Sequence, residues 1–336
     1  MEKRLNAGAA ALAALALAAL AGCGGAPQAA RPARPEIHGN LHRVEHGGNV
    51  AYIFGSFHLG RPHWFPLGAA VEGAMGRADV FAFEFDLTQM YLVPLITARH
   101  IFLRDGMTLR EFLPPDVYEP FIANLSTYRS FDYASMRTLT PMTLSALIAM
   151  EIFEEMGLAP EHSVDSHVLR FALERRAPAA ERMRYDELRQ AIAAHAGGAP
   201  VIGLNSLESE MALAFDLPDE AQIALAQITL SRAEGLATAQ ELRMAEMYEA
   251  QDMDGFLELR LAMAGADDAF SRHTLQSLIH GRCRIFAAEI ARLLRETEAP
   301  TTFFVTMGLL HIIGGDADTN VLGLLREAGF EVAPAF

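Results

Sequence analysis

The chain has 336 residues, 51% of them hydrophobic, and a formal net charge of −15 at pH 7. A chain of this size and apolar content can bury a full hydrophobic core, in one large domain or in two small ones. The excess of negative charge argues against a surface that binds nucleic acid or anionic lipid headgroups, so we expect no nucleic-acid partner.

The first residues predict an export signal. A short charged segment precedes an Ala/Leu run over residues 9–21 that is too short to span a bilayer comfortably. The sequence Leu-Ala-Gly-Cys at residues 20–23 then resembles the lipobox of bacterial lipoproteins, which implies cleavage before Cys23 and attachment of lipid to its thiol. We therefore expect a lipoprotein signal peptide over residues 1–22. The alternative is an ordinary secretory signal with an incidental cysteine.

Residues 23–35 predict a flexible tether, because glycine and proline stand among Ala and Arg without hydrophobic periodicity. The folded part is expected to be a single domain over residues 36–336. We expect an exported protein anchored to a membrane through its lipid, and because Gly24 rather than aspartate follows Cys23, we expect it on the periplasm-facing side of the outer membrane. Once Cys23 is lipidated only Cys283 remains, so no intramolecular disulfide is expected.

The N-terminal part of the folded chain predicts a β-hairpin that leads to a histidine. Residues 41–45 alternate between apolar and polar, residues 47–49 supply a Gly-Gly-Asn turn, and an apolar run of strand length follows over residues 50–54. This run stops at Gly55, and His58 follows three residues later, so a buried strand ends in a Gly-x-x-His loop.

A second strand after the hairpin carries two carboxylates. A helical pattern over residues 67–76 leads directly into the predicted strand Asp79–Asp86. Because strand side chains alternate, three phenylalanines fall on one face and Glu84 and Asp86 on the other. This compact order predicts two parallel strands with Glu84 beside the loop of His58. The other explanation is that both carboxylates simply lie at a solvated strand end.

The middle of the chain is predicted to be mainly helical. Residues 87–173 and 219–294 show helical patterns. Between them lie a polar, helical excursion over residues 174–198 and a short apolar strand over residues 200–205.

Two features of this helical middle bear on function. His162, Asp165 and His167 form a cluster that could bind a metal, although histidines on the surface or at a helix start are the commoner explanation. Arg282 lies inside the apolar stripe of a helix, where a charge is disfavoured unless it is paired. Its guanidinium either engages a carboxylate or an oxyanion, or reaches solvent from the edge of the stripe.

The C-terminal part repeats the pattern of the first unit. The predicted strand Thr301–Met307 runs into Gly308 and, three residues later, His311; a helix from about Asn320 and a last strand over residues 330–332 follow. The two units look like a distant internal duplication. We therefore predict an α/β (α+β) fold, a central mixed β-sheet built from two strand–Gly-x-x-His–helix–strand units with a large helical middle region.

If both units join one sheet, His58, Glu84 and His311 meet at the carboxyl ends of its strands. Two imidazoles and a carboxylate suit a divalent transition metal with open positions, which supports hydrolysis at neutral pH, and Arg282 would stabilise developing negative charge. A metal-free alternative uses one histidine as general base, oriented by Glu84. The chain has neither Gly-x-Ser-x-Gly nor His-Glu-x-x-His, and the apolar helical setting of Cys283 disfavours a thiol nucleophile.

These motifs resemble the TraB/PrgY/GumN family, which includes the TIKI proteases and shares an α/β fold with erythromycin esterases and ChaN-like haem-binding lipoproteins. The resemblance rests on residues 54–60 and 64–67, the Phe83-Glu84 strand, Arg282, and residues 304–311 with Gly329-Phe330. It implies a metal-dependent hydrolase, in the TIKI branch a protease that uses manganese or cobalt. The metal ligands that it implies are His58, Glu84 and His311, with catalytic roles for Glu84 and Arg282.

The chain departs from this family pattern at four positions. Ser56 stands where threonine is usual, Ile312 where leucine is usual, Cys283 where asparagine commonly follows the arginine, and Asn205 in place of a glutamate. Residues 174–198 are an extra segment before Asn205.

The expectation is therefore a lipid-anchored, extracytoplasmic, metal-dependent hydrolase that cleaves a peptide or another acyl bond. The alternative from a different class is a lipoprotein that binds haem, iron or a signalling peptide without catalysis. A third reading is a structural relative whose site has lost its function.

Overall fold

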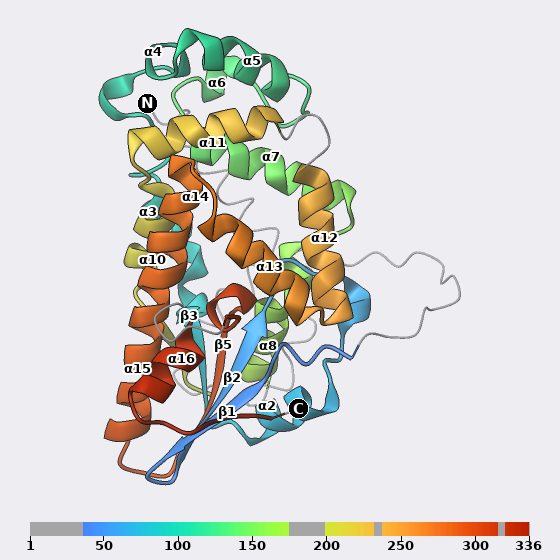
Figure 1. The fold of residues 1–336 in the computed structure, drawn as a ribbon, viewed down its shortest axis with the longest axis vertical. Coiled ribbons are helices and arrows are strands. Elements are labelled where there is room, and N and C mark those ends of the chain that lie inside the picture. The colour runs from blue at the N-terminus through green and yellow to red at the C-terminus, as the bar shows by residue number, and fades with distance from the viewer. Residues whose placement is uncertain (1–35, 175–198, 232–236, 315–319, 336) are drawn as a thin grey trace.

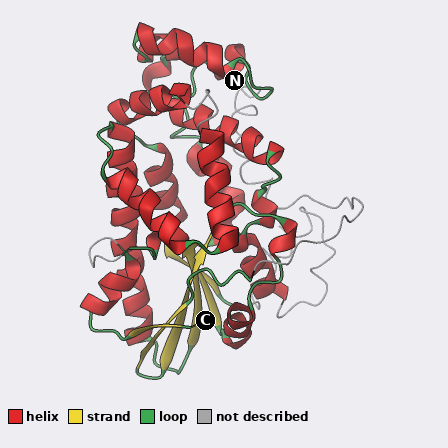
Figure 2. Ribbon diagram, turned by 45° about the vertical axis from the view of Figure 1, so that its right-hand side comes forward, coloured by secondary structure: helices red, strands yellow, loops and turns green. Residues whose placement is uncertain are grey.

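The computed structural model describes residues 36–174, 199–231, 237–314 and 320–335. They form a six-stranded sheet flanked by helices, with a large group of helices beyond one end of the strands (Figures 1 and 2). This mixed sheet with its helical middle confirms the predicted α/β (α+β) class. The predicted signal peptide, the tether and the excursion over residues 175–198 lie outside the described residues.

The strand order of the sheet is β4-β3-β5-β2-β1-β6. The strands are β1 (His42–His46), β2 (Asn49–Ser56), β3 (Val80–Phe85), β4 (Val201–Asn205), β5 (Thr302–Gly308) and β6 (Val332–Pro334). Strands β2, β3, β4 and β5 run parallel, β1 is antiparallel to β2, and β6 is antiparallel to β1. The predicted hairpin is β1 and β2, and the short apolar strand of the middle region is β4.

The strand of the second Gly-x-x-His unit, β5, lies inside the sheet. Strand β5 is inserted between β2 and β3 and pairs Ser56 with Gly308 on one side and Phe83 with Thr306 on the other. Strands β2 and β3 are therefore parallel, as expected, but Glu84 and His58 do not come from adjacent strands. The near-continuous apolar sequence of β5 is typical of a parallel strand whose two faces are both covered, and β5 is buried along most of its length.

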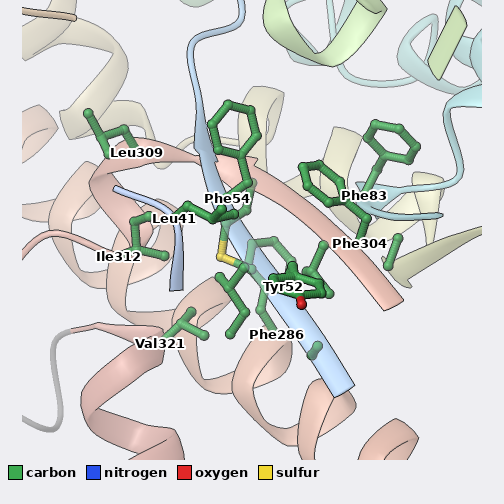
Figure 3. Packing of buried hydrophobic residues seen from close by; sticks show 14 of the residues in the cluster. Leu41, Tyr52, Phe54, Phe83, Phe286, Phe304, Leu309, Ile312 and Val321 are labelled. Carbon is green, nitrogen blue, oxygen red and sulfur yellow. The ribbon is translucent and has the colours of Figure 1, made fainter. Parts of the chain in front are cut away.

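Aromatic side chains from three neighbouring strands pack together. The ring centroid of Phe304 lies 5.7 Å from that of Phe54 and 6.1 Å from that of Phe81, the separation of favourable tilted pairs. Leu309 and Ile312, from the turn after β5, pack against the backbone of β2 (Figure 3). Apolar contacts thus hold together β2, β3 and β5, the strands that carry the predicted site.

Helices α15 and α16 pack along one side of the sheet, and α2 and α8 along the other (Figure 1). Their bounds are Ala69–Arg77 for α2, Val164–Glu174 for α8, Arg282–Glu296 for α15 and Val321–Glu327 for α16. The predicted helix over residues 67–76 is thus α2, with Gly76 inside it rather than at its end. The last strand begins two residues later than predicted, after a turn in which Gly329 has a positive φ of 88°.

The remaining helices form the predicted helical middle. They are α3 (Val93–Thr97), α4 (Leu109–Phe112), α5 (Pro115–Leu125), α6 (Tyr133–Met136), α7 (Pro141–Glu155), α10 (Leu207–Phe215), α11 (Asp219–Ser231), α12 (Ala237–Ala250), α13 (Met253–Ala264) and α14 (Ala269–His273). Several of them enclose a second hydrophobic cluster around Phe121, apart from the core on the sheet. Among the described residues, no helix has the length and apolar character of a membrane span.

The close packing against β2 predicts that Gly55 cannot carry a side chain. A Cβ at Gly55 would lie 2.7 Å from the carbonyl oxygen of Gly39 and 2.8 Å from a methyl carbon of Ile312. We expect Gly55→Ala to lower the free energy of unfolding by about 1–3 kcal/mol, the usual cost of overpacking. Urea denaturation measures this loss. The control is Gly76→Ala at an exposed position of α2, where the new Cβ meets no atom within 4 Å and should stabilise the protein by about 0.5–1 kcal/mol.

Candidate functional site

Three neighbouring parallel strands end at the same edge of the sheet and carry the predicted site residues. Strand β2 ends two residues before His58, β3 carries Glu84 next to its last residue, and β5 ends at Gly308, three residues before His311. Because β5 lies between the other two strands, its end stands between His58 and Glu84. The topology therefore collects residues that are far apart in the sequence at one edge.

The carboxylate of Glu84 is the centre of this site. Its side chain is 7% exposed, Oε1 accepts a hydrogen bond of 2.7 Å from the backbone N–H of Gly308, and Oε2 accepts one from the guanidinium of Arg282. The Nε2 atoms of His311 and His58 lie 3.6 Å and 3.8 Å from Oε1. The structure thus brings together the four residues that the sequence proposed for the site.

Glycine at position 308 leaves room between these groups. A Cβ there would lie 3.2 Å from Nε2 of His58, 3.3 Å from Oε1 of Glu84 and 3.6 Å from Cδ2 of His311. Any side chain would therefore enter the space that the two imidazoles and the carboxylate face. The requirement at Gly308 is close approach, not an unusual backbone angle.

His58 is held by a carboxylate that the sequence did not assign to the site. Oδ2 of Asp165 lies 2.9 Å from Nδ1 of His58, and Oδ1 accepts a hydrogen bond of 2.9 Å from the hydroxyl of Ser56. Asp165 stands in the first turn of α8. In the sequence it appeared only as part of a cluster with two histidines, and no local pattern links it to a ring 107 positions away.

Arg282 lies between two buried carboxylates. Its Nη2 contacts Oε2 of Glu84 and Oε2 of Glu210, whose side chains are 7% and 1% exposed. Glu210, on α10, also accepts a hydrogen bond of 2.8 Å from the side-chain amide of Asn205. Of the two explanations offered by the sequence, the structure supports the paired guanidinium. Arg282 directly follows a π-helical segment, Thr274–Gly281, a feature often found beside functional sites.

The second histidine is far more enclosed than the first. The side chain of His311 is 4% exposed, whereas that of His58 is 61% exposed. Sγ of Cys283, which is fully buried, lies 3.4 Å from Nδ1 of His311, and the ring centroids of Phe286 and His311 lie 5.2 Å apart in a T-shaped arrangement. His311 therefore has a neutral partner where His58 has a charged one.

The surroundings give the two buried carboxylates different acidities. Burial opposes the ionisation of Glu84, but Arg282, both histidines and the N–H of Gly308 together lower its pKa to about 2. Burial raises the pKa of Glu210, and the charge of Glu84 adds to this, against the opposing effects of Arg282 and Asn205. Glu84 thus has a lowered pKa and is ionised at neutral pH, whereas the pKa of Glu210 is raised.

The two histidines also differ in pKa. Burial opposes protonation of His58, an effect limited by its exposure, while Asp165 and then Glu84 favour it, and its pKa rises to about 9. Burial, assisted by Arg282, lowers the pKa of His311 to about 3 despite the attraction of Glu84. Burial raises the pKa of Cys283 to about 12, so its thiol stays protonated. Without a bound ion the site holds one cationic and one neutral imidazole.

Three other candidates from the sequence do not join the site. The ring of His167 stacks on Phe65 at 4.4 Å between centroids, and the backbone of His162 packs against Gly60, so these histidines form no cluster with Asp165. The carboxylate of Asp86 accepts hydrogen bonds from the backbone and side chain of Thr88 and caps the turn after β3.

The donor types at this edge fit a divalent transition metal. The site offers two imidazole nitrogens and a carboxylate oxygen that face one space, and Asp165 holds Nδ1 of His58 in the way that carboxylates orient metal-binding histidines. As the side chains stand, however, no group of three or more His, Cys, Asp or Glu in the described part of the chain is arranged closely enough to hold an ion. The donor types thus fit a metal ion, although the described side chains as they stand do not form a complete set of ligands.

Comparison with known proteins identifies one family. The sequence model of the TraB/PrgY/gumN family matches residues 40–194 and 184–334, which together include both histidine loops and the helical middle. No curated protein and no solved structure matches the chain.

The contact between Asp165 and His58 predicts a change in the pKa of that ring. We expect Asp165→Asn to lower the pKa of His58 from about 9, because the first attraction that favours its protonation is removed. A pKa raised in the folded state stabilises the protein below the unfolded value of about 6.5, and this contribution is lost as pH rises through 9. The destabilisation by Asp165→Asn should therefore be greatest below pH 6.5. NMR titration of the ring in metal-free protein measures the pKa.

The matched control is Asp86→Asn, which removes a carboxylate from the same edge of the sheet that caps a turn instead. It should leave the pKa of His58 unchanged. An unaltered His58 pKa in Asp165→Asn would contradict the assignment of the contact.

Proposed function

Because the chain belongs to the TraB/PrgY/gumN family, we propose that it is a hydrolase for a peptide or another acyl bond, with His58, Glu84, His311 and Arg282 as its site. One observation carries the proposal. Two imidazole nitrogens and an ionised carboxylate face the same space beside Gly308, at the carboxyl edge of a parallel sheet. This edge is where α/β sheets bind their ligands.

The acidities of these groups favour the metal-dependent form of the proposal. With pKa values of about 2 and about 3, Glu84 and His311 are both weak bases. Neither can readily take a proton from free water, whose pKa is about 15.7. A bound divalent ion supplies what is missing, since it lowers the pKa of its water to about 7 and polarises an acyl carbonyl. Manganese or cobalt, as in the TIKI branch that the sequence resembles, is the expected ion.

Each residue then has a defined task. His58, Glu84 and His311 are the residues that would hold the ion, and Asp165 orients the ring of His58 from behind. Arg282 keeps Glu84 ionised through their contact. Its Nε is buried and has no hydrogen-bond partner among the described residues.

Metal content and hydrolysis test the proposal together. We expect protein that lacks residues 1–23 to contain about one manganese or cobalt ion per chain after growth with these metals, and to hydrolyse peptide or ester libraries. Elemental analysis measures the first, and mass spectrometry of the libraries the second. His58→Ala and His311→Ala should reduce both by about tenfold or more, because each removes a ligand. His167→Ala, whose ring stacks on Phe65 away from the site, is the control.

The possible outcomes separate the readings. Hydrolysis that depends on His58 but survives chelation and complete loss of metal would overturn the metal-dependent form and favour general-base catalysis by the histidines. Metal or haem bound without hydrolysis of any library would instead favour a binding lipoprotein.

We also propose that the protein is a lipoprotein of the periplasm-facing outer membrane, tethered through Cys23. The support is the lipobox-like sequence at residues 20–23, which lies outside the described residues. We expect Cys23→Ser to move the protein from the membrane to the soluble fraction of a bacterial host and to abolish incorporation of labelled fatty acid, because the acceptor thiol is gone. Fractionation on a sucrose gradient measures the release of the variant. It also shows whether the unaltered protein sediments with the inner or the outer membrane. Membrane attachment that survives this substitution would refute the lipid anchor.

A further inference from the structure

Helices α12 and α13 contact the chain on either side of both site histidines. We propose that Arg260 and Tyr248 are positioning residues of this helical corner, with Arg260 of α13 fixing the loop of His311 and Tyr248 of α12 fixing the loop of His58. The inference deepens the proposed function, on which it rests for the use that the two rings serve. Neither helix contributes a residue to the site itself.

The end of α12 holds the loop of His58 on both sides. The hydroxyl of Tyr248 is buried and donates a hydrogen bond of 2.8 Å to the carbonyl oxygen of Gly55, three residues before His58. The carboxylate of Glu249 accepts hydrogen bonds of 3.0 Å each from three side chains that follow the histidine, those of Arg61, His63 and Trp64. The loop is therefore fixed before and after the ring that it presents.

Arg260 does the same for the loop of His311. Its side chain is buried, and Nη1 donates hydrogen bonds to the carbonyl oxygens of Leu310 and, at 2.7 Å, Ile313. A buried guanidinium is normally paired with a carboxylate, but in the described part of the chain Arg260 makes no such pair and its Nη2 has no hydrogen bond. Both hydrogen bonds of Nη1 go to one backbone turn, the turn that carries His311.

A short corner, residues 251–252, joins α12 and α13, so the contacts of Tyr248 and Arg260 are made by one pair of adjoining helices. Asp252 caps α13 by accepting a hydrogen bond of 2.9 Å from the backbone N–H of Gly255. A Cβ at Gly255 would lie 2.7 Å from Sδ of Met247 on α12, which shows how closely the helices approach. The side chain of Gln251, in the corner itself, accepts hydrogen bonds from the backbone of His38 and Gly39.

Ring resonances of the two histidines test the inference on metal-free protein that lacks residues 1–23 and carries ¹⁵N-labelled histidine. Spectra of His58→Ala and His311→Ala assign the rings. We expect Arg260→Met, which keeps the length of the side chain without its donors, to shift or broaden the resonances of His311 and leave those of His58 in place. Tyr248→Phe, which removes only a hydroxyl, should affect His58 and not His311. Leu261→Gln, at a 62% exposed neighbour of Arg260, should affect neither.

A merely structural role would lower the unfolding temperature of both variants while the rings of the folded protein kept their resonances, and this result would overturn the inference. A shift of both rings by Arg260→Met alone would also overturn it. Should Arg260→Met not fold, Arg260→Lys can still contact one carbonyl and must shift His311 in a smaller but detectable way, or the inference fails. Because no metal or substrate is present, the result does not depend on whether the protein is a hydrolase.

Discussion

A carboxylate that is buried and yet ionised is the constraint on which this site depends. Taking a lone charge out of water costs several kcal/mol, and Glu84 is stable only because a guanidinium, two imidazoles and a backbone N–H surround it. These partners come from three different parts of the chain. The insertion of β5 between β2 and β3 is what brings them within reach, because it places Gly308 and His311 beside Glu84.

Charges alternate outward from Glu84. His58 and Arg282 face it, and each is in turn held by an outer carboxylate, Asp165 on one side and Glu210 on the other. The positions of these groups therefore depend on one another. Without Asp165 or Glu210, the cation that this carboxylate holds could move toward Glu84. The alternation also accounts for the cationic form of His58, which Asp165 favours, whereas burial keeps His311 neutral beside the thiol of Cys283.

The sequence predicted those parts of the fold whose signals are local. Apolar runs that close in Gly-x-x-His marked the ends of β2 and β5, and the alternation of β3 set the face of Glu84. The insertion of β5 between two earlier strands could not be predicted, because pairing between distant strands leaves no periodic trace in either one. Asp165 and Glu210 were missed for the same reason. Each stands in the first turn of a helix, where an acidic residue is already explained by the helix dipole.

The position of Glu210 accounts for one departure from the family pattern. The family places a glutamate where this chain has Asn205, yet Arg282 still has a second carboxylate, which comes from Glu210 five residues further on. An amide at position 205 can donate to Oε1 of Glu210, whereas a carboxylate there could only accept. A glutamate at position 205 would thus add a third carboxylate near a single guanidinium. Asparagine at 205 therefore supplies a hydrogen-bond donor to Glu210 and adds no further charge near Arg282.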